Sequence, residues 1–241
     1  MALKLLAVDT TSGACSVALY QDGAVTEQFV KAERDHTRRL LPMVEAVLAD
    51  GGCRLADVDA LAVSQGPGSF TGLRIAISCV QGLAFAADKP VIPVSSLAAM
   101  ATGAIRANPD WQGAPVLPAL DARMQEVYWG LYAADRPGEA LLPDAVASPE
   151  QVVAALEEAG HGPAGDGQCT FYAAGPGWQY PSLAALTPLG VWEEAAIHAQ
   201  DIAVLAAGLW PSGKFVAAQD LEPAYLRNEV TWKKRERIRD R

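Results

Sequence analysis

The first 107 residues alternate between apolar runs typical of buried strands and runs with the 3.6-residue spacing of amphipathic helices. Alternating apolar positions on both sides of Asp22 indicate a hairpin. The expected elements are a strand over 3–9, a hairpin over 14–32, a helix over 36–52, a strand over 58–66, a helix over 69–90, a strand over 90–94 and a helix over 95–107. This order predicts an α/β fold built on a mixed sheet with an antiparallel edge.

The second half opens in the same way as the first. Apolar runs on either side of Asp121 predict a strand, a turn and a second strand, just as the first strand ends at Asp9. The elements expected there are a strand pair over 115–134, a helix over 148–160, a strand over 169–175 and a closing helix over 195–210. The repeat predicts two lobes, 1–107 and 108–241, the second smaller one carrying the closing helix and a basic tail.

The composition is that of an ordinary globular protein, with 51% hydrophobic and 20% charged residues. No uninterrupted apolar run approaches the roughly 18 residues that cross a bilayer, and the first residues lack the apolar core of a signal peptide. The four cysteines lie far apart in the sequence and lack metal-ligand spacing. This pattern indicates reduced thiols. We therefore expect a cytoplasmic protein with no membrane contact.

The net charge of −9 indicates a surface that repels nucleic acid. The tail from Lys233 to Arg241 differs, because it holds six basic and two acidic residues. Such a tail can contact RNA phosphates or an acidic partner. The alternative is a solvated, frayed chain end.

Candidate chemistry begins where the first expected strand ends. Asp9 is followed by Thr10, Thr11 and Ser12, and such a turn can present hydroxyls and backbone N–H groups to a phosphate or a metal-bound water. Actin-like and sugar-kinase-like ATPases place a hairpin of this kind against the nucleotide. The alternative is an ordinary hydroxyl-rich turn. We interpret these four residues as a weak or vestigial site for ATP or ADP.

The segment GPGSFTG (66–72) precedes the second long helix and allows two interpretations. Its glycines suit close approach to a phosphate, but it lacks a Walker A Lys-Ser/Thr pair and the GxGxxG spacing. Pro67 also removes one N–H group that a phosphate would need. Small residues on the following helix, such as Ala76 and Gly82, favour close packing instead. We expect a turn that sets the entry of the helix, with Ser69 or Thr71 as its cap.

Six segments then occur together in one order: LAVDTTSGACSVAL, ERDHTRRLLPMVEAVL, VSQGPGSFTGLRIAISCVQGLA, PVSSLAAMA, LDARMQEVYWGLY and EPAYLRNEV. They resemble the bacterial TsaB (YeaZ) family from the first strand to Arg227. The resemblance implies a two-lobed actin-like (ASKHA, RNase H-like) ATPase fold. It also implies a role in tRNA processing, as a non-catalytic partner of TsaD in making threonylcarbamoyladenosine next to the tRNA anticodon.

The resemblance further implies the partners. A heterodimer with TsaD is expected, a ternary complex with the ATPase TsaE, and a homodimer when TsaD is absent, because one self-complementary surface can serve both. tRNA is expected to be contacted indirectly or through the basic tail. The helices from His36 to Leu48 and from Ser69 to Ala86 are expected to carry this interface. The candidate contacts are Leu40, Val44, Val47, Leu73, Ile77 and Val80.

The comparison with TsaD also implies that catalysis is missing. TsaD carries two metal-binding histidines one helical turn apart, and Ser96 and Met100 stand at the matching positions here, where neither suits a divalent cation. In the second half, bulky Arg123 and Met124 stand where ATPases of this fold use glycines, which hinders approach to a phosphate. Asp121 is free to pair with Arg123 or with a partner. We expect no catalytic residue, no metal and no required cofactor.

Two alternatives stay open from the residues. A small nucleotide-dependent kinase of the same fold predicts tight ATP binding and turnover by the isolated chain. A peptidase-like hydrolase predicts bound metal, or a triad from Ser69, His36 and Asp9, although no GxSxG elbow supports a nucleophile. The other two histidines, His161 and His198, show no ligand spacing.

Overall fold

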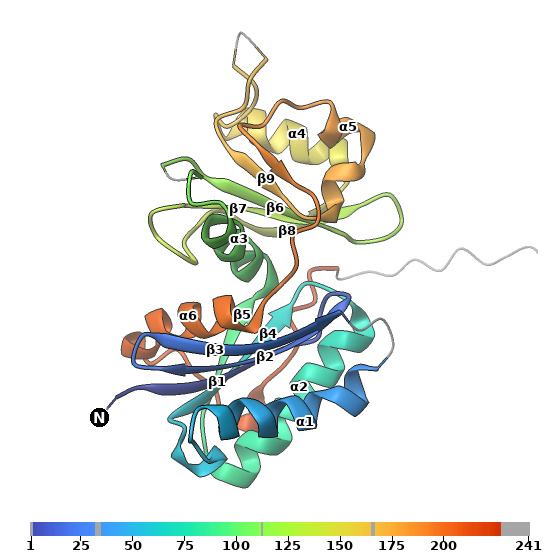
Figure 1. Cartoon of the computed structure of the whole chain (residues 1–241). Helices are drawn as coiled ribbons and strands as arrows, with labels where there is room; N and C mark the ends of the chain where they lie inside the picture. The colour runs from blue at the N-terminus through green and yellow to red at the C-terminus, as the bar shows by residue number, and fades with distance from the viewer. Residues whose placement is uncertain (1, 32–34, 112, 165–166, 228–241) are drawn as a thin grey trace, which may run out of the picture.

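The computed structural model describes residues 2–31, 35–111, 113–164 and 167–227. Two five-stranded sheets lie one above the other (Figure 1). The first has the order β3-β2-β1-β4-β5, and its strands are β1 (Lys4–Asp9), β2 (Ala14–Gln21), β3 (Ala24–Lys31), β4 (Ala60–Gly66) and β5 (Val91–Ser95). Because β1 pairs antiparallel with β2 and parallel with β4, the sheet is mixed with an antiparallel edge, as predicted.

The second sheet repeats this topology. Its order is β10-β9-β6-β7-β8, and β6 takes the place of β1, since it pairs antiparallel with β7 and parallel with β9. Its strands are β6 (Val116–Asp121), β7 (Val127–Tyr132), β8 (Ala140–Ala147), β9 (Tyr172–Ala174) and β10 (Val191–Trp192). The predicted duplication and the two-lobed actin-like fold are confirmed. The sequence missed two edge strands: β8 contains Pro143, which masks its strand pattern, and β10 has only two residues.

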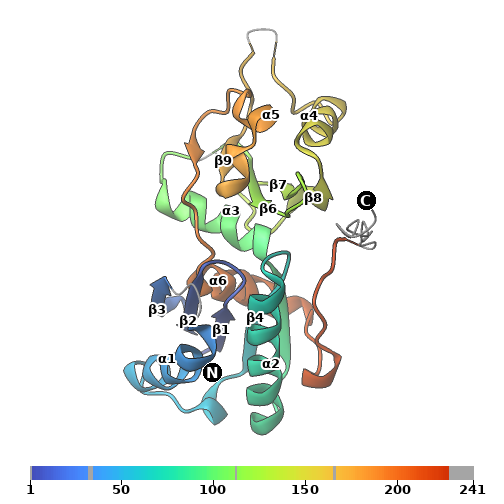
Figure 2. The same ribbon diagram turned by 90° about the vertical axis from the view of Figure 1, so that its right-hand side faces the viewer.

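Helices form three layers around the sheets (Figures 1 and 2). α1 and α2 cover the outer face of the first sheet, α3 and α6 fill the space between the sheets, and α4 and α5 cover the second sheet. The α-helices are α1 (His36–Asp50), α2 (Phe70–Ala87), α3 (Ser96–Ala107), α4 (Pro149–Glu158), α5 (Pro181–Ala184) and α6 (Ala199–Leu209). Short 3₁₀ turns are η1 (Leu55–Asp57), η2 (Pro176–Gln179), η3 (Trp210–Ser212) and η4 (Ala218–Asp220).

The last described part of the chain returns to the first sheet. α6 packs on β1 and β2, and Val216 exchanges backbone hydrogen bonds with Val91 of β5. Residues 218–227, which we call the strap, bury Leu221 in the core below α2. Figure 2 shows the strap, in red, running past α2 toward the second lobe. A division at residue 107 therefore separates the two sheets but not the two lobes, because α6 and the strap contribute to the first.

α2 is the one described helix that is long and apolar enough to cross a membrane, judged by length and composition alone. Its 18 residues have a mean hydropathy of 1.4. One face of α2 packs on the first sheet, as in the core helix of a globular lobe. A second face is also apolar, which matters for the functional site.

Candidate functional site

The turn after β1 starts with buried residues, Asp9, Thr10 and Thr11, whose side chains are hydrogen-bonded within the chain. The carboxylate of Asp9 accepts hydrogen bonds from Thr11, from the backbone N–H at 3.2 Å and from Oγ1 at 2.6 Å. Thr10 Oγ1 donates to the carbonyl of Gly72 in α2 at 2.6 Å. Burial raises the pKa of Asp9, although the hydrogen bonds from Thr11 oppose this shift. The predicted phosphate residues thus bond to one another and to α2.

The GPGSFTG segment lies directly on this turn. The N–H of Ser69 donates to the Thr11 carbonyl at 2.8 Å, and Ser69 Oγ caps α2 by accepting from the N–H of Gly72 at 3.3 Å. A Cβ on Gly72 would lie 1.9 Å from the Thr10 carbonyl oxygen, and one on Gly68 2.8 Å from that of Thr11. The glycines therefore serve the close packing of two backbones, which confirms the packing interpretation.

The actin-like fold implies a nucleotide, but this turn does not fit a phosphate. The N–H and hydroxyl of Thr11 are directed to Asp9, and the hydroxyl of Thr10 is directed to α2. Ser12 keeps a hydroxyl that has no partner among the described residues. Because Asp9, Thr10 and Thr11 are bonded to one another and to the start of α2, they hold the turn against that helix.

The matching turn after β6 has a different backbone. Arg123, Met124 and Gln125 all have positive φ angles, of 62°, 56° and 64°, a conformation that costs energy for side chains other than glycine. Asp121 holds this turn by accepting from the N–H of Arg123 at 2.8 Å and from the hydroxyl of Tyr180 at 2.9 Å. Of the two pairings that the sequence left open for Asp121, the structure has the one with Arg123, whose Nη1 lies 3.4 Å from Asp121 Oδ2.

The positions of the TsaD metal histidines are filled by core side chains. Ser96 and Met100 are both buried in α3, and a Cβ on Gly175 would lie 2.7 Å from the sulfur of Met100. A thioether packed against backbone offers no site for a hard cation. Within residues 2–31, 35–111, 113–164 and 167–227, no group of three His, Cys, Asp or Glu side chains is placed to hold a metal.

The triad of Ser69, His36 and Asp9 that the hydrolase alternative would need is not joined by any hydrogen bond among the described residues. Ser69 Oγ is used as a helix cap, and the buried Nε2 of His36 has no partner in the described part of the chain. His198 instead pairs with Glu27, its Nδ1 lying 3.0 Å from the carboxylate, and its ring stacks on Phe29. No nucleophile is hydrogen-bonded to either His36 Nε2 or His198 Nδ1 among the described residues.

The six predicted contact residues lie in the core of the first lobe, so they present almost no free surface to a partner. Of the six, Leu40 also borders the groove between α1 and α2. None is more than 4% exposed, and all belong to the apolar cluster between the first sheet and its two outer helices. The physical reason is that the sheet of the chain itself covers the stripe on which they stand. These residues are Leu40, Val44, Val47, Leu73, Ile77 and Val80.

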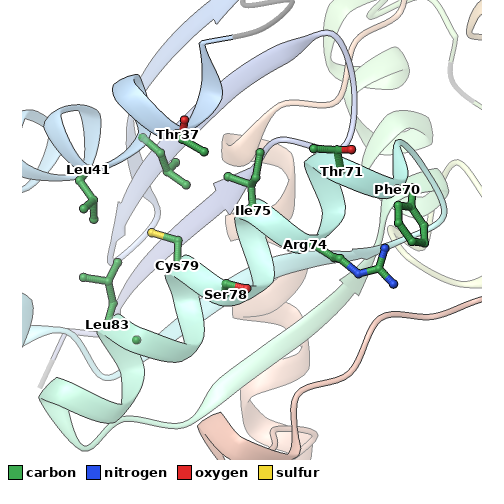
Figure 3. Close-up of a pocket in the computed structure, with 11 residues that line it drawn as sticks. Thr37, Leu41, Phe70, Thr71, Arg74, Ile75, Ser78, Cys79 and Leu83 are labelled. Atoms are coloured by element: carbon green, nitrogen blue, oxygen red, sulfur yellow. The ribbon is translucent and has the colours of Figure 1, made fainter.

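A second apolar stripe lies exposed between the same two helices. There, α1 and α2 form a groove of about 700 Å³, which we call the α1–α2 groove. Leu41 is 51% exposed and Phe70 65% exposed. In Figure 3, Cys79 and Leu83 lie on the side of α2 that faces Leu41 of α1. The lining consists of Thr37, Leu40, Leu41, Phe70, Thr71, Arg74, Ile75, Ser78, Cys79, Gly82 and Leu83.

The sequence held a signal for this groove that the prediction did not use. Ile75, Cys79 and Leu83 repeat at four-residue spacing, beside the stripe that α2 buries. The sheet covers only one face of α2. A helix with two apolar stripes therefore leaves its second stripe uncovered by that sheet. The fold and the site together define a two-lobed actin-like protein with a first turn that α2 covers and an exposed apolar groove.

Comparisons with known proteins identify the family. A family model described as "TsaD: tRNA N6-adenosine threonylcarbamoyltransferase" matches residues 23–206. The chain is 42% identical over 238 residues to the tRNA threonylcarbamoyladenosine biosynthesis protein TsaB of Escherichia coli K12, covering 96% of this chain and 98% of that protein. It is 40% identical over 241 residues to TsaB of Haemophilus influenzae, covering 96% and 97%.

A solved structure, YeaZ from Pseudomonas aeruginosa, superposes with a TM-score of 0.80 at 42% identity, covering 93% of this chain and 100% of that one. The chain belongs to the TsaB (YeaZ) family and is a homologue of tRNA threonylcarbamoyladenosine biosynthesis proteins.

Proposed function

We propose that the chain is a non-catalytic scaffold subunit that docks TsaD through the α1–α2 groove. Its role is to support threonylcarbamoylation of N6 of the adenosine next to the tRNA anticodon. The observation that carries this proposal is the groove itself, because exposed apolar surfaces of this kind mark interaction sites. The match to a TsaD model over residues 23–206 supports a shared fold, so TsaD can offer an equivalent helix pair.

The absence of catalysis rests on the chemistry of the residues present. Ser96 and Met100 are poor ligands for a divalent cation, and the turn that contains Asp9 is covered by α2. We propose that no cofactor is required and that ATP or ADP binds weakly if at all. The groups that a kinase or a peptidase-like hydrolase of the same fold would need are not brought together among the described residues.

The partners follow from the same surface. A second copy of the chain covers the α1–α2 groove when TsaD is absent, since an apolar groove on each copy can pair with its twin. TsaE joins the heterodimer, and all components meet in the cytoplasm. The basic tail from Lys233 to Arg241, which we expect near tRNA, lies outside the described residues.

The first test is binding. Ile75→Glu places a charge on the wall of the groove and is expected to abolish co-elution with TsaD in size-exclusion chromatography. Leu189→Glu is the matched control, because Leu189 is an exposed apolar residue of the second lobe, 43% exposed. The proposal is contradicted if both variants lose binding to the same extent, or if neither variant loses it.

The second test is function in cells. Depletion of the chain is expected to remove threonylcarbamoyladenosine from tRNA nucleosides, measured by mass spectrometry. Wild type and Leu189→Glu should restore the nucleoside, and Ile75→Glu should not. Normal nucleoside levels after verified depletion exclude the role.

A further inference from the structure

One end of the α1–α2 groove carries a fixed arginine. The guanidinium carbon of Arg74 lies 3.3 Å from the ring centroid of Phe70 and 5.7 Å from that of Tyr225. Its Nη2 also donates to the hydroxyl of Tyr225 at 2.7 Å. Figure 3 shows Arg74 beside Phe70, at the end of the groove away from Leu83. We call Phe70, Arg74 and Tyr225 the arginine cluster.

The strap brings Tyr225 to this position. The N–H of Ala224 donates to the carbonyl of Gln65 at 2.7 Å, and Gln81 in α2 donates to the carbonyl of Leu221 at 3.0 Å. These bonds tie the strap to β4 and α2 in the four residues that precede the tyrosine. The arginine is therefore oriented by a residue 151 positions away in the sequence.

Arg74 has no acidic partner among the described residues. Arg38 also lacks an acidic partner there. Unlike Arg74, however, its side chain is held by no hydrogen bond or ring contact in the described part of the chain. The other described arginines all pair with a carboxylate, namely Arg39, Arg54, Arg106, Arg123, Arg136 and Arg227. Arg74 thus differs from the other described arginines in being held by aromatic side chains and not by a carboxylate.

The chemistry of the cluster indicates what it binds. A guanidinium forms paired, charge-assisted hydrogen bonds with a carboxylate, and an arginine already held in place loses less side-chain entropy on binding. Phe70 and Tyr225 are 65% and 49% exposed, so they can exclude water around such a pair. Among the described residues, Arg74 is also the one charged side chain that lines the α1–α2 groove.

We propose that Arg74 binds an Asp or Glu side chain of the protein helix that fills the α1–α2 groove, and so sets the register of that partner. This inference rests on the proposed function, with TsaD as the partner. The docked helix carries an apolar face over Ile75 and Leu83 and a carboxylate at the end near Phe70. Tyr225 is a positioning residue, because it acts by orienting the guanidinium.

The test is titration calorimetry of TsaD with variants at low and high salt. Arg74→Met is expected to weaken binding by about tenfold, and to remove most of the salt dependence seen with wild type. Arg74→Lys keeps the charge but not the paired geometry, and should be intermediate. Tyr225→Phe should weaken binding less and keep the salt dependence. Arg136→Met, an exposed arginine of the second lobe, is the matched control and should bind as wild type.

The outcomes separate the two proposals. If Ile75→Glu abolishes binding while Arg74→Met binds TsaD like wild type at both salt concentrations, the groove stands and the carboxylate proposal fails. If neither variant affects binding, both fail. Binding of inorganic phosphate or ATP by the isolated chain, lost in Arg74→Met, identifies Arg74 as a phosphate site and overturns the carboxylate proposal. Thermal melts of each variant verify that it is folded.

Discussion

Arg106 and Asp201 form a two-point ion pair between the sheets, with Nε 2.7 Å from Oδ1 and Nη2 2.9 Å from Oδ2. Arg106 lies in the last turn of α3 and Asp201 in the first turn of α6. A Cβ on Gly103 would lie 2.6 Å from the carboxylate, so the glycine leaves room for it. The pair therefore joins α3, which packs below the second sheet, to α6, which packs on the first sheet.

Loss of Arg106 should destabilise the protein strongly. Asp201 is only 1% exposed, so Arg106→Met leaves a buried carboxylate without its counter-charge. We expect the free energy of unfolding to fall by about 1–3 kcal/mol at neutral pH, because Asp201 is buried while Arg106, 41% exposed, is partly screened by water. Urea denaturation followed by circular dichroism measures this change.

The double variant is the control for this pair. Arg106→Met combined with Asp201→Leu replaces both charges by apolar groups and should recover much of the stability. A single Arg106→Met variant within about 0.5 kcal/mol of wild type would show that the pair contributes little.

A methyl group at Gly72 should disrupt the contact between α2 and the turn after β1. Its Cβ would meet the Thr10 carbonyl oxygen at 1.9 Å, so the two backbones must separate. We expect Gly72→Ala to lower the free energy of unfolding by about 3 kcal/mol or more. Thermal denaturation of the isolated chain is the measurement.

Gly82 provides the matched control on the same helix. No atom lies within 4 Å of a Cβ at Gly82, and alanine favours a helix interior over glycine. Gly82→Ala should therefore stabilise the chain by about 0.5–1 kcal/mol. If the two substitutions changed stability by similar amounts, close packing would not be the reason for a glycine at position 72.

The sequence predicts the two sheets well because strand alternation and the Asp-turn pattern are local. It does not predict which side of α2 meets the sheet, since the stripe with Leu73 and Ile77 and the stripe with Ile75 and Leu83 are both apolar. Burial by a distant sheet decides between them. The contact of Arg74 with Tyr225 is likewise invisible locally, because 151 positions separate the two residues.

Ile77→Glu separates the core stripe from the groove stripe. Ile77 is 4% exposed and packs between α2 and the first sheet, so a carboxylate there is buried without a partner. We expect the variant to unfold or aggregate, because such burial costs several kcal/mol. Ile75→Glu, on the neighbouring stripe of α2, should stay folded and lose only the binding of TsaD.

Circular dichroism and size-exclusion chromatography of the two variants decide the matter. A folded Ile77→Glu monomer that fails to bind TsaD would restore Ile77 as a contact and would contradict the buried position.

Glu27 of β3 ties the start of α6 to the first sheet. Its carboxylate accepts from the N–H of Gln200 at 3.1 Å and from Gln200 Nε2 at 2.6 Å. It also accepts from Ser16 Oγ at 2.7 Å and pairs with His198. Burial alone would raise the pKa of Glu27, but the bonds from His198, Ser16 and Gln200 outweigh it, and its pKa lies below the usual value.

A lowered pKa makes Glu27 a source of acid sensitivity. A carboxylate of this kind stabilises the fold at pH values above its unfolded pKa, and the contribution is lost as pH falls through the folded pKa. Glu27→Gln should lower the free energy of unfolding by about 1–3 kcal/mol at neutral pH, and by less in acid. Urea denaturation from neutral pH down through the folded pKa of Glu27 measures the difference in the free energy of unfolding between variant and wild type. If the gap stayed constant with pH, the ionised form of Glu27 would not be what stabilises the junction of β3 and α6.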